Sequence, residues 1–193
     1  MKLTKLKKII AADHFRFYKN VSNKEILKHI FYSESFKYIF WMRVCSFTKK
    51  GKHRLLFLFT RLILNHYKYK LGICIPYNTQ ISEGFYIGHF GGIIVSPKAI
   101  IGQNCNLSHG VTIGKISRGK NSGAPIIGNN VYIGPGAKII GGITIGDNVA
   151  IGANSVVVSD VPKNCTFGGI PAKQISTSTS SLYINNTDYL NEL

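Results

Sequence analysis

Aliphatic residues recur at every sixth position through the second half of the chain. The series starts at Ile75 and ends at Val157, with one two-residue shift after Ile93 and one eight-residue insertion after Ile113. Its members are Ile75, Ile81, Ile87, Ile93, Ile101, Leu107, Ile113, Ile127, Ile133, Ile139, Ile145, Ile151 and Val157. Most of them precede Gly, Ser or another small residue. Thirteen positions in phase argue against a chance series of β-hairpins and indicate a repeat architecture.

The six-residue spacing predicts a triangular prism. Each unit forms one short strand and one corner, so that three units complete one coil, and the aliphatic residue points inward. There it stacks on its counterpart in the next coil at the ~4.8 Å spacing between strands. Gly, Asn and Asp suit the corners because they tolerate a positive φ. We therefore predict a mainly β fold, a left-handed parallel β-helix over residues 71–175.

The chain before this region has the apolar spacing of helices. Ser22 and Glu25 have the spacing of a capping box at the start of one helix. Apolar periodicity then predicts a second helix over 36–47 and a third over 55–64. We expect a basic helical N-terminal region over 1–70. Residues 176–193, rich in Ser, Thr and Asn, are expected to form a loosely ordered tail.

Positive charge is concentrated in the predicted helices. Residues 1–70 hold 17 of the 24 Lys and Arg residues and 3 of the 8 Asp and Glu residues, and aromatic residues are interspersed among them. Three interpretations stay open. The apolar helix faces pack on each other and on the open end of the prism, or the basic helices contact a membrane surface of anionic lipid. The third interpretation, nucleic-acid binding, lacks a visible recognition module, and we expect no nucleic-acid partner.

Two further absences narrow the class of protein. No apolar run reaches the ~18 residues of a membrane-spanning helix, and the basic start is not followed by an apolar segment with a cleavage site. We expect no signal peptide and a cytoplasmic location, with contact to the inner face of the membrane left open. The cysteines are scattered without a C-x-x-C spacing, which predicts free thiols and no metal site.

Two histidines fall at one corner of the predicted prism, one coil apart. His89 and His109 each lie two residues after an inward aliphatic residue, and the next two coils carry Pro135 and Ala153 at the same corner. A narrow ligand would fit along this small apolar column. An imidazole with a pKa near 6.5 suits the removal of a proton from an attacking hydroxyl. Both are predicted catalytic residues, although His109 alternatively contacts substrate, and a plain surface role stays open for either.

Five segments resemble the serine acetyltransferase branch of the hexapeptide acyltransferases. They are residues 89–95, 109–114, 133–137, 151–157 and 168–173. The resemblance covers about half the chain and looks closest to capsular and exopolysaccharide O-acetyltransferases of the colanic acid type. It implies acetyl-CoA as the donor, a homotrimer and His89 as the general base. It also places Pro135 and Ala153 on the column that contacts the coenzyme.

The eight-residue insertion forms a glycine-rich loop with three cations. Lys115, Arg118 and Lys120 lie within it, directly after Gly114. Such a loop would close over the cleft of a neighbouring subunit and meet coenzyme phosphates or an acidic glycan, unless it is a solvated surface loop. We assign Gly114, Lys115 and Lys120 to coenzyme binding and Arg118 to substrate binding.

The chain differs from serine acetyltransferases where those enzymes hold serine. The Asp before their catalytic His is Gly88 here, and their second catalytic Asp maps onto Cys74. Their Arg-His pair for the substrate carboxylate maps onto Gly123-Ala124, and their acidic-rich helical domain onto the basic region. These differences favour a hydroxyl of a surface polysaccharide or its sugar precursor as the acceptor, with Cys74 and Gly88 near the substrate.

Three other functions remain as alternatives. Serine O-acetylation in cysteine biosynthesis is one. A γ-type carbonic anhydrase on the same scaffold is another, but it needs three zinc-binding histidines and the repeats offer only His89 and His109. The third is a protein without catalytic activity, in which the β-helix presents the basic helices to a membrane.

Overall fold

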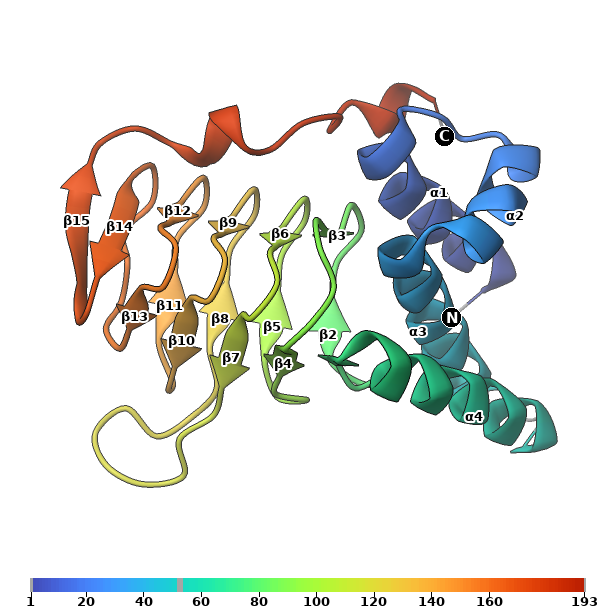
Figure 1. The fold of residues 1–193 in the computed structure, drawn as a ribbon, viewed down its shortest axis with the longest axis horizontal. Coiled ribbons are helices and arrows are strands. Elements are labelled where there is room, and N and C mark those ends of the chain that lie inside the picture. Colours follow the sequence, from blue (N-terminus) through green and yellow to red (C-terminus); the bar gives the residue numbers. More distant parts are fainter. Residues whose placement is uncertain (1, 52–53, 193) are drawn as a thin grey trace.

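The computed structural model describes residues 2–51 and 54–192, and it combines a helical part with a β-helix (Figure 1). Residues 1, 52–53 and 193, which fall in the predicted N-terminal region and tail, lie outside the described residues. The helices are α1 (Leu3–Tyr18), α2 (Asn23–Tyr32), α3 (Glu34–Lys50) and α4 (Arg54–Leu71). Within the described ranges, no helix is long and apolar enough to cross a bilayer.

Two details of the helical part differ from the sequence prediction. Helix α1 lies within the predicted helical region of 1–70, but it precedes the first helix predicted individually, which starts at Ser22; its apolar residues, such as Leu6 and Ile10, are buried. Ser22 does stand at the N-cap of α2, but its side chain makes no capping hydrogen bond.

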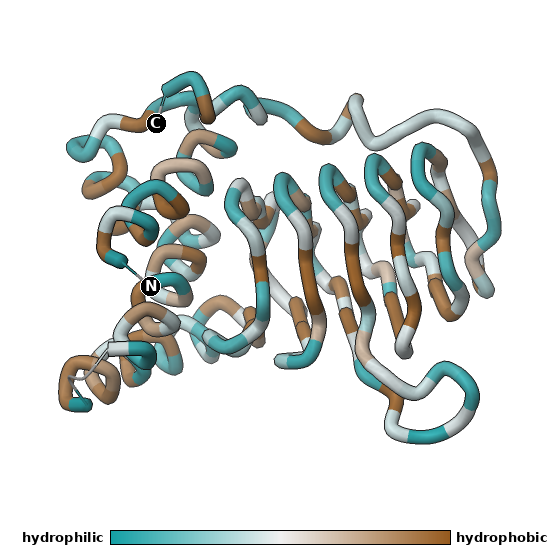
Figure 2. Tube along the Cα trace, turned by 180° about the vertical axis from the view of Figure 1, so that it is seen from behind, coloured by the Kyte–Doolittle hydropathy of each residue, from teal (hydrophilic) through white to brown (hydrophobic). Residues whose placement is uncertain are grey.

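The β-helix consists of three parallel sheets, which confirms the predicted left-handed parallel β-helix. One sheet has the order β1-β4-β7-β10-β13, the second β11-β8-β5-β2, and the third β15-β14-β12-β9-β6-β3 with an antiparallel last pair. The strands are β1 (Ile73–Cys74), β2 (Gln80–Ile81), β3 (Tyr86–Ile87), β4 (Ile93–Val95), β5 (Ile100–Ile101), β6 (Asn106–Leu107), β7 (Thr112–Gly114), β8 (Ile126–Ile127), β9 (Tyr132–Ile133), β10 (Lys138–Ile140), β11 (Thr144–Ile145), β12 (Ala150–Ile151), β13 (Val156–Val157), β14 (Thr166–Gly169) and β15 (Ala172–Ser176). Figure 2 shows hydrophobic residues recurring along the stacked strands and hydrophilic residues at the corners.

The two-residue shift of the repeat lies earlier than the sequence prediction placed it. Ile87 pairs with Leu107, 20 residues on, whereas Val95 pairs with Ile113, 18 residues on. The extra two residues therefore belong to the corner between β3 and β4, and Val95 rather than Ile93 takes the repeat position. Both Ile93 and Val95 are buried, because alternate residues of this strand point inward.

One edge of the prism, here called the asparagine edge, is built from stacked asparagines. The residues are Asn104, Asn130, Asn148 and Asn164, each with a φ of 54–60°. Each of the first three donates its Nδ2 hydrogen to the Oδ1 of the next, over 3.1, 3.0 and 2.9 Å. Asparagine thus serves this edge in two ways: it tolerates the left-handed backbone, and its side chain bonds to the asparagine of the next coil.

The C-terminal segment after β15 runs back along the β-helix to the helices (Figure 1). The Tyr183 carbonyl accepts from Asn106 Nδ2 at 2.7 Å, and the Tyr189 hydroxyl donates to Asn104 Oδ1 at 2.9 Å. Ser180 donates to the Asn130 carbonyl. Specific hydrogen bonds therefore hold at least three points of the segment that was expected to be loosely ordered.

The helices close one end of the β-helix and share its core. The Tyr38 hydroxyl donates to the carbonyl of Ile75 at 2.9 Å and lies 3.1 Å from the amide nitrogen of Ile75, which donates to it. Met42, Phe57 and Leu64 belong to the same buried cluster as the inward isoleucines. The open end of the prism is thus covered by apolar helix faces.

Candidate active site

The structure brings the two predicted histidines together. The ring centroids of His89 and His109 lie 6.2 Å apart, at an interplanar angle of 70°. Both side chains are exposed. They occupy the edge of the prism between the sheet of β3 and the sheet of β4, here called the histidine edge.

The corner that carries His89 has an unusual backbone. Counted from β3, His89 matches His109, but counted back from β4 the match is Gly91. Gly91 and Gly92 have φ values of 108° and 66°, and a Cβ on Gly92 would lie 3.4 Å from the Cα of Gly110. Glycine therefore permits the close stacking of this longer corner on the next. Gly88 lies immediately before His89, and its amide donates to the carbonyl of Leu107 at 3.0 Å.

Pro135 and Ala153 continue the histidine edge on the following coils. The amide of Gly136 donates to the carbonyl of His109 at 2.9 Å, and the amide of Asn154 donates to the carbonyl of Pro135 at 2.8 Å. These bonds place Pro135 and Ala153 directly along the column from the histidines. The column of two imidazoles followed by two small apolar residues, expected from the repeat, is present in the structure.

The predicted loop residues lie on a different edge of the prism from the histidines. The loop of residues 115–125, here called the cationic loop, projects between β7 and β8 (Figure 1). Ile116 and Gly123 form an antiparallel bridge at its base, and Asn121 bonds to Val158 and Gly142. Its three cations, all exposed, are Lys115, Arg118 and Lys120. Gly114 ends β7, where a Cβ would come within 2.8 Å of Ile140 Cδ1.

Cys74 lies on a sheet next to the histidine edge rather than on the edge. It pairs with Ile94 in the outward row of the sheet that begins at that edge, and its side chain is half-buried. Among residues 2–51 and 54–192, no group of three or more His, Cys, Asp and Glu side chains could hold a metal ion.

One cation near the histidines, Lys138, is not among the site residues predicted from the sequence. Lys138 occupies the same outward row as Cys74, and its Nζ donates to the carbonyl oxygen of Gly110, the residue after His109. The side chain is half-buried. The only signal in the sequence was a basic residue between two inward positions, Ala137 and Ile139, which is also the pattern of a solvated strand residue.

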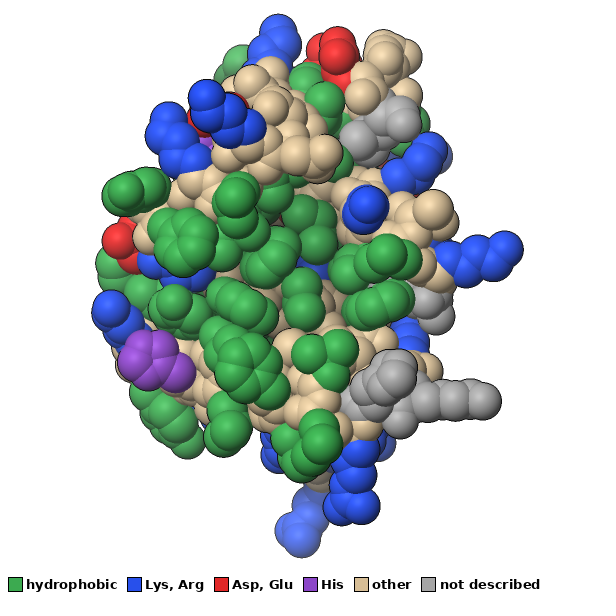
Figure 3. Space-filling view, turned by 90° about the vertical axis from the view of Figure 1, so that its right-hand side faces the viewer, with side chains coloured by type: hydrophobic (Ala, Val, Ile, Leu, Met, Phe, Trp, Pro, Cys, Tyr) green, Lys and Arg blue, Asp and Glu red, His purple; other side chains and the backbone are tan. Residues whose placement is uncertain are grey.

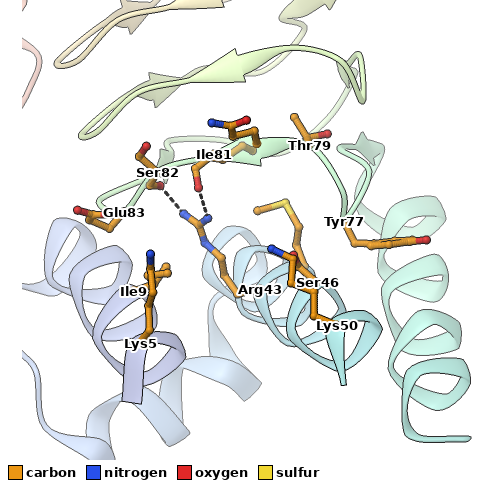
Figure 4. Close-up of a pocket in the computed structure, with 12 residues that line it drawn as sticks. Lys5, Ile9, Arg43, Ser46, Lys50, Tyr77, Thr79, Ile81, Ser82 and Glu83 are labelled. Atoms are coloured by element: carbon orange, nitrogen blue, oxygen red, sulfur yellow. Dashed lines mark hydrogen bonds between the residues drawn. The ribbon is translucent and has the colours of Figure 1, made fainter. Parts of the chain in front are cut away.

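A separate pocket of ≈ 270 Å³ lies between α1, α3 and β2 (Figure 4). Lys5 and Lys50 reach it from the two helices, and Arg43 lies between them. The Arg43 guanidinium donates to the carbonyls of Ile81 and Ser82, each at 2.6 Å, and to a buried carboxylate. Its donors therefore serve the junction between helices and β-helix. None of the lining residues comes from the histidine edge, so the pocket and the histidine pair are separate features of the molecule.

Comparison with known proteins identifies the family whose fold and repeats this chain shares. Residues 124–159 match the bacterial transferase hexapeptide (six repeats) family. The chain is 42% identical over 120 residues to the serine acetyltransferase of Synechococcus elongatus, which covers 61% of this chain and 48% of that protein. It is 41% identical over 105 residues to that of Helicobacter pylori J99, covering 54% and 61%. The chain thus spans about half the length of the curated relatives it matches.

Two solved structures extend the similarity beyond the repeats. Serine acetyltransferase of Neisseria gonorrhoeae in complex with serine has a TM-score of 0.75 and 31% identity, covering 90% of this chain and 70% of that one. The Brucella abortus enzyme in complex with coenzyme A has a TM-score of 0.71 and 27% identity, covering 90% and 67%.

The six-residue repeats define the class, the hexapeptide-repeat transferases. The identity and coverage shared with the gonococcal structure show that the chain belongs to the serine acetyltransferase-like family of hexapeptide acyltransferases.

The expected polysaccharide acceptor, and with it the closer likeness to capsular enzymes, is wrong. The curated relatives and the solved structures are serine acetyltransferases, one of them solved with serine. The expectation rested on differences at a few positions of the repeats, Cys74 and Gly88 among them. It also assumed that the basic helices replace the family's helical domain. The β-helix alone cannot account for 90% of the chain, so helices α1–α4 are largely part of the shared fold.

Proposed function

We propose that this chain transfers the acetyl group of acetyl-CoA to the hydroxyl of L-serine. The observation that carries the proposal is the similarity, over 90% of the chain, to a serine acetyltransferase solved with serine. The exposed His89–His109 pair supports it, because the reaction needs a base at an accessible surface.

In the proposed reaction His89 is the general base. Its imidazole takes the proton of the serine hydroxyl as the oxygen attacks the thioester carbonyl carbon. Backbone N–H groups of the glycine-rich corner stabilise the oxyanion of the tetrahedral intermediate. Collapse of the intermediate breaks the carbon–sulfur bond, and the imidazolium returns the proton to the coenzyme A thiolate. O-acetylserine and free coenzyme A result.

His109 has the supporting role in this scheme. Gly88 supplies no carboxylate beside His89, so the neighbouring ring of His109 contacts the substrate or orients the base. Gly88 itself, without a side chain, leaves room at the base for serine.

Coenzyme binding in this proposal requires a second subunit. Pro135 and Ala153 form the small apolar column beside the histidines, where the pantetheine arm lies. The cationic loop is on another edge of the same prism, so its lysines reach the phosphates only from a neighbouring prism. Repeating that head-to-tail contact around a threefold axis closes a ring, which makes a homotrimer the proposed assembly.

Release of free coenzyme A tests the function. Purified protein with acetyl-CoA is given L-serine, D-serine or sugar acceptors, and thiol release is followed with a chromogenic disulfide. We expect release that depends on L-serine and falls in the His89→Ala variant by about 10²–10⁴-fold, the usual contribution of a general base. His66→Ala, an exposed substitution on α4, is the matched control.

Size-exclusion chromatography must give the same assembly for both variants. Absence of serine-dependent release from wild-type protein would exclude serine as the acceptor, and an undiminished rate in His89→Ala would exclude His89 as the base.

A further inference from the structure

Helix α4 is apolar on two opposite faces. Phe57, Leu64 and Leu71 are buried toward α3 and the β-helix. On the other side Leu55 is 82% exposed and Leu62 68% exposed. Phe59 and Tyr69 are also exposed and fall in the same stripe, since residues four, seven and fourteen positions after Leu55 lie on one side of a helix. An exposed apolar stripe of this kind marks an interaction surface.

The outward stripe of α4 is flanked by cations. Arg54, Arg61 and Lys68 follow one another at seven-residue steps along one side of it. Figure 3 shows apolar side chains gathered across the helical end of the molecule, with Lys and Arg side chains around them. Leu27 and Phe31 of α2 add to the exposed apolar surface of the helices. This combination is typical of helices that lie in the interface of a membrane.

We propose that the helical end docks on a bilayer surface that contains anionic lipid. Helix α4 lies parallel to the surface, with Leu55, Phe59 and Leu62 in the boundary between headgroups and acyl chains. The basic residues beside the stripe contact the negative headgroups. Because the helices close only one end of the β-helix, the histidine edge remains in water (Figure 1).

Charge distinguishes a lipid surface from a second copy of the chain. A twofold contact through this face would bring the same surface of two molecules together. Arg54, Arg61 and Lys68 flank the stripe in both copies, and residues 1–70 as a whole carry 17 basic and 3 acidic residues, so the two faces would repel each other. Anionic headgroups complement the same charge, and the attraction to them falls as salt screens it.

Sedimentation with vesicles tests the docking. The full chain is mixed with vesicles of phosphatidylcholine, or of phosphatidylcholine with 30% phosphatidylglycerol, and the bound fraction is measured at low and high salt. We expect at least about tenfold stronger partition onto the anionic vesicles, reduced at high salt. Leu55→Gln/Leu62→Gln should lose about tenfold or more of that partition.

Two matched controls separate this face from general stickiness. Ile175→Gln/Leu182→Gln changes side chains that are similarly exposed, 67% and 83%, outside the helical part, and should bind as wild type does. Arg54→Glu/Arg61→Glu should remove the preference for anionic lipid, whereas Lys163→Glu/Lys173→Glu should keep it. Circular dichroism checks that each variant is folded.

Three outcomes would overturn the proposal. The first is absence of binding by folded wild-type protein, and the second is equal binding of the α4 variant and its control. The third is a wild-type protein that does not bind vesicles but forms a larger assembly, seen by light scattering, which dissociates in Leu55→Gln/Leu62→Gln. That last result would assign the face to a second copy.

Discussion

On β10, the side chain of Lys138 reaches the histidine edge, where its ammonium donates to the carbonyl of Gly110. A cation beside an exposed imidazole pair suits the carboxylate of an amino-acid substrate. The sequence resemblance maps the family's Arg-His pair onto Gly123-Ala124, so we propose Lys138 as its replacement on the histidine edge.

Substitution Lys138→Met keeps most of the stem and removes the charge. Loss of a charged hydrogen bond of about 1.5–3 kcal/mol should raise the KM for L-serine roughly ten- to hundredfold, while kcat changes far less. Steady-state kinetics at saturating acetyl-CoA measure both constants, with exposed Lys98→Met as the control. A KM that does not move would limit Lys138 to its bond with Gly110.

His14 predicts how stability depends on pH. It is buried, with Nδ1 2.6 Å from the carbonyl oxygen of Asn20 and Nε2 2.9 Å from Nδ1 of His29. Burial lowers the pKa of His14, so the folded protein binds a proton there less readily than the unfolded chain, in which His titrates near pH 6.5. The unfolded state therefore binds the extra proton, and stability is lost as pH falls below about 6.5.

Urea unfolding between pH 5 and 7.5 measures this effect. The midpoint should decline toward pH 5 in wild type and decline less in His14→Phe, whose ring stays beside Phe36. His66→Phe, at an exposed position, should keep the wild-type slope. Equal slopes in all three proteins would remove His14 as the cause.

At the scale of elements, the cationic loop is predicted to act between chains. Lys115→Gln/Lys120→Gln should raise the KM for acetyl-CoA about tenfold and leave the KM for serine unchanged, because phosphates lose two charge-assisted contacts. Co-purified mixtures of this variant with His89→Ala then decide the geometry. A loop that serves the neighbouring histidine edge restores activity in mixed assemblies above that of either parent, and a loop that serves its own chain does not.

The elements that sequence predicted are those fixed by local repetition. Inward packing imposes the six-residue period, and the period alone places His109 one coil from His89. The sequence did not show whether Ile93 or Val95 occupies the six-residue repeat position. Both side chains point inward, and either one fits the series. Helix α1 was not predicted as an element of its own, because its lysines mask the spacing of its buried residues.

Contacts between distant segments left no local signal. The bond from Tyr189 to Asn104 joins residues 85 positions apart, and nothing in a polar tail indicates it. The position of Lys138 beside the histidines likewise follows only from its contact with Gly110, on the preceding coil. The histidine column was therefore predictable from the sequence, while the cation beside it and the tail's contacts were not.

For the whole molecule, one buried ion pair connects the helices with the β-helix. Asp13 of α1 accepts from Arg43 of α3 at 2.8 Å, and both are buried. The amide of Phe85, in the corner before β3, donates to Asp13 at 2.8 Å, and Arg43 donates to the carbonyls of Ile81 and Ser82. Asp13 and Arg43 thus bond both to each other and to the backbone of the first coil. Because both side chains are buried, water cannot take the place of either bonding partner.

Removal of one partner should uncouple the two parts. Asp13→Ala leaves the Arg43 charge buried and uncompensated, at a cost of about 3–5 kcal/mol in the free energy of unfolding. Hydrogen exchange followed by mass spectrometry should show amides of α1 and α3 opening before those of the β-helix, where wild type opens both together. Asp13→Leu/Arg43→Met should recover part of the loss, because an apolar pair leaves no buried charge. If the double variant were no more stable than Asp13→Ala, the cost would lie in lost packing rather than in the unpaired guanidinium.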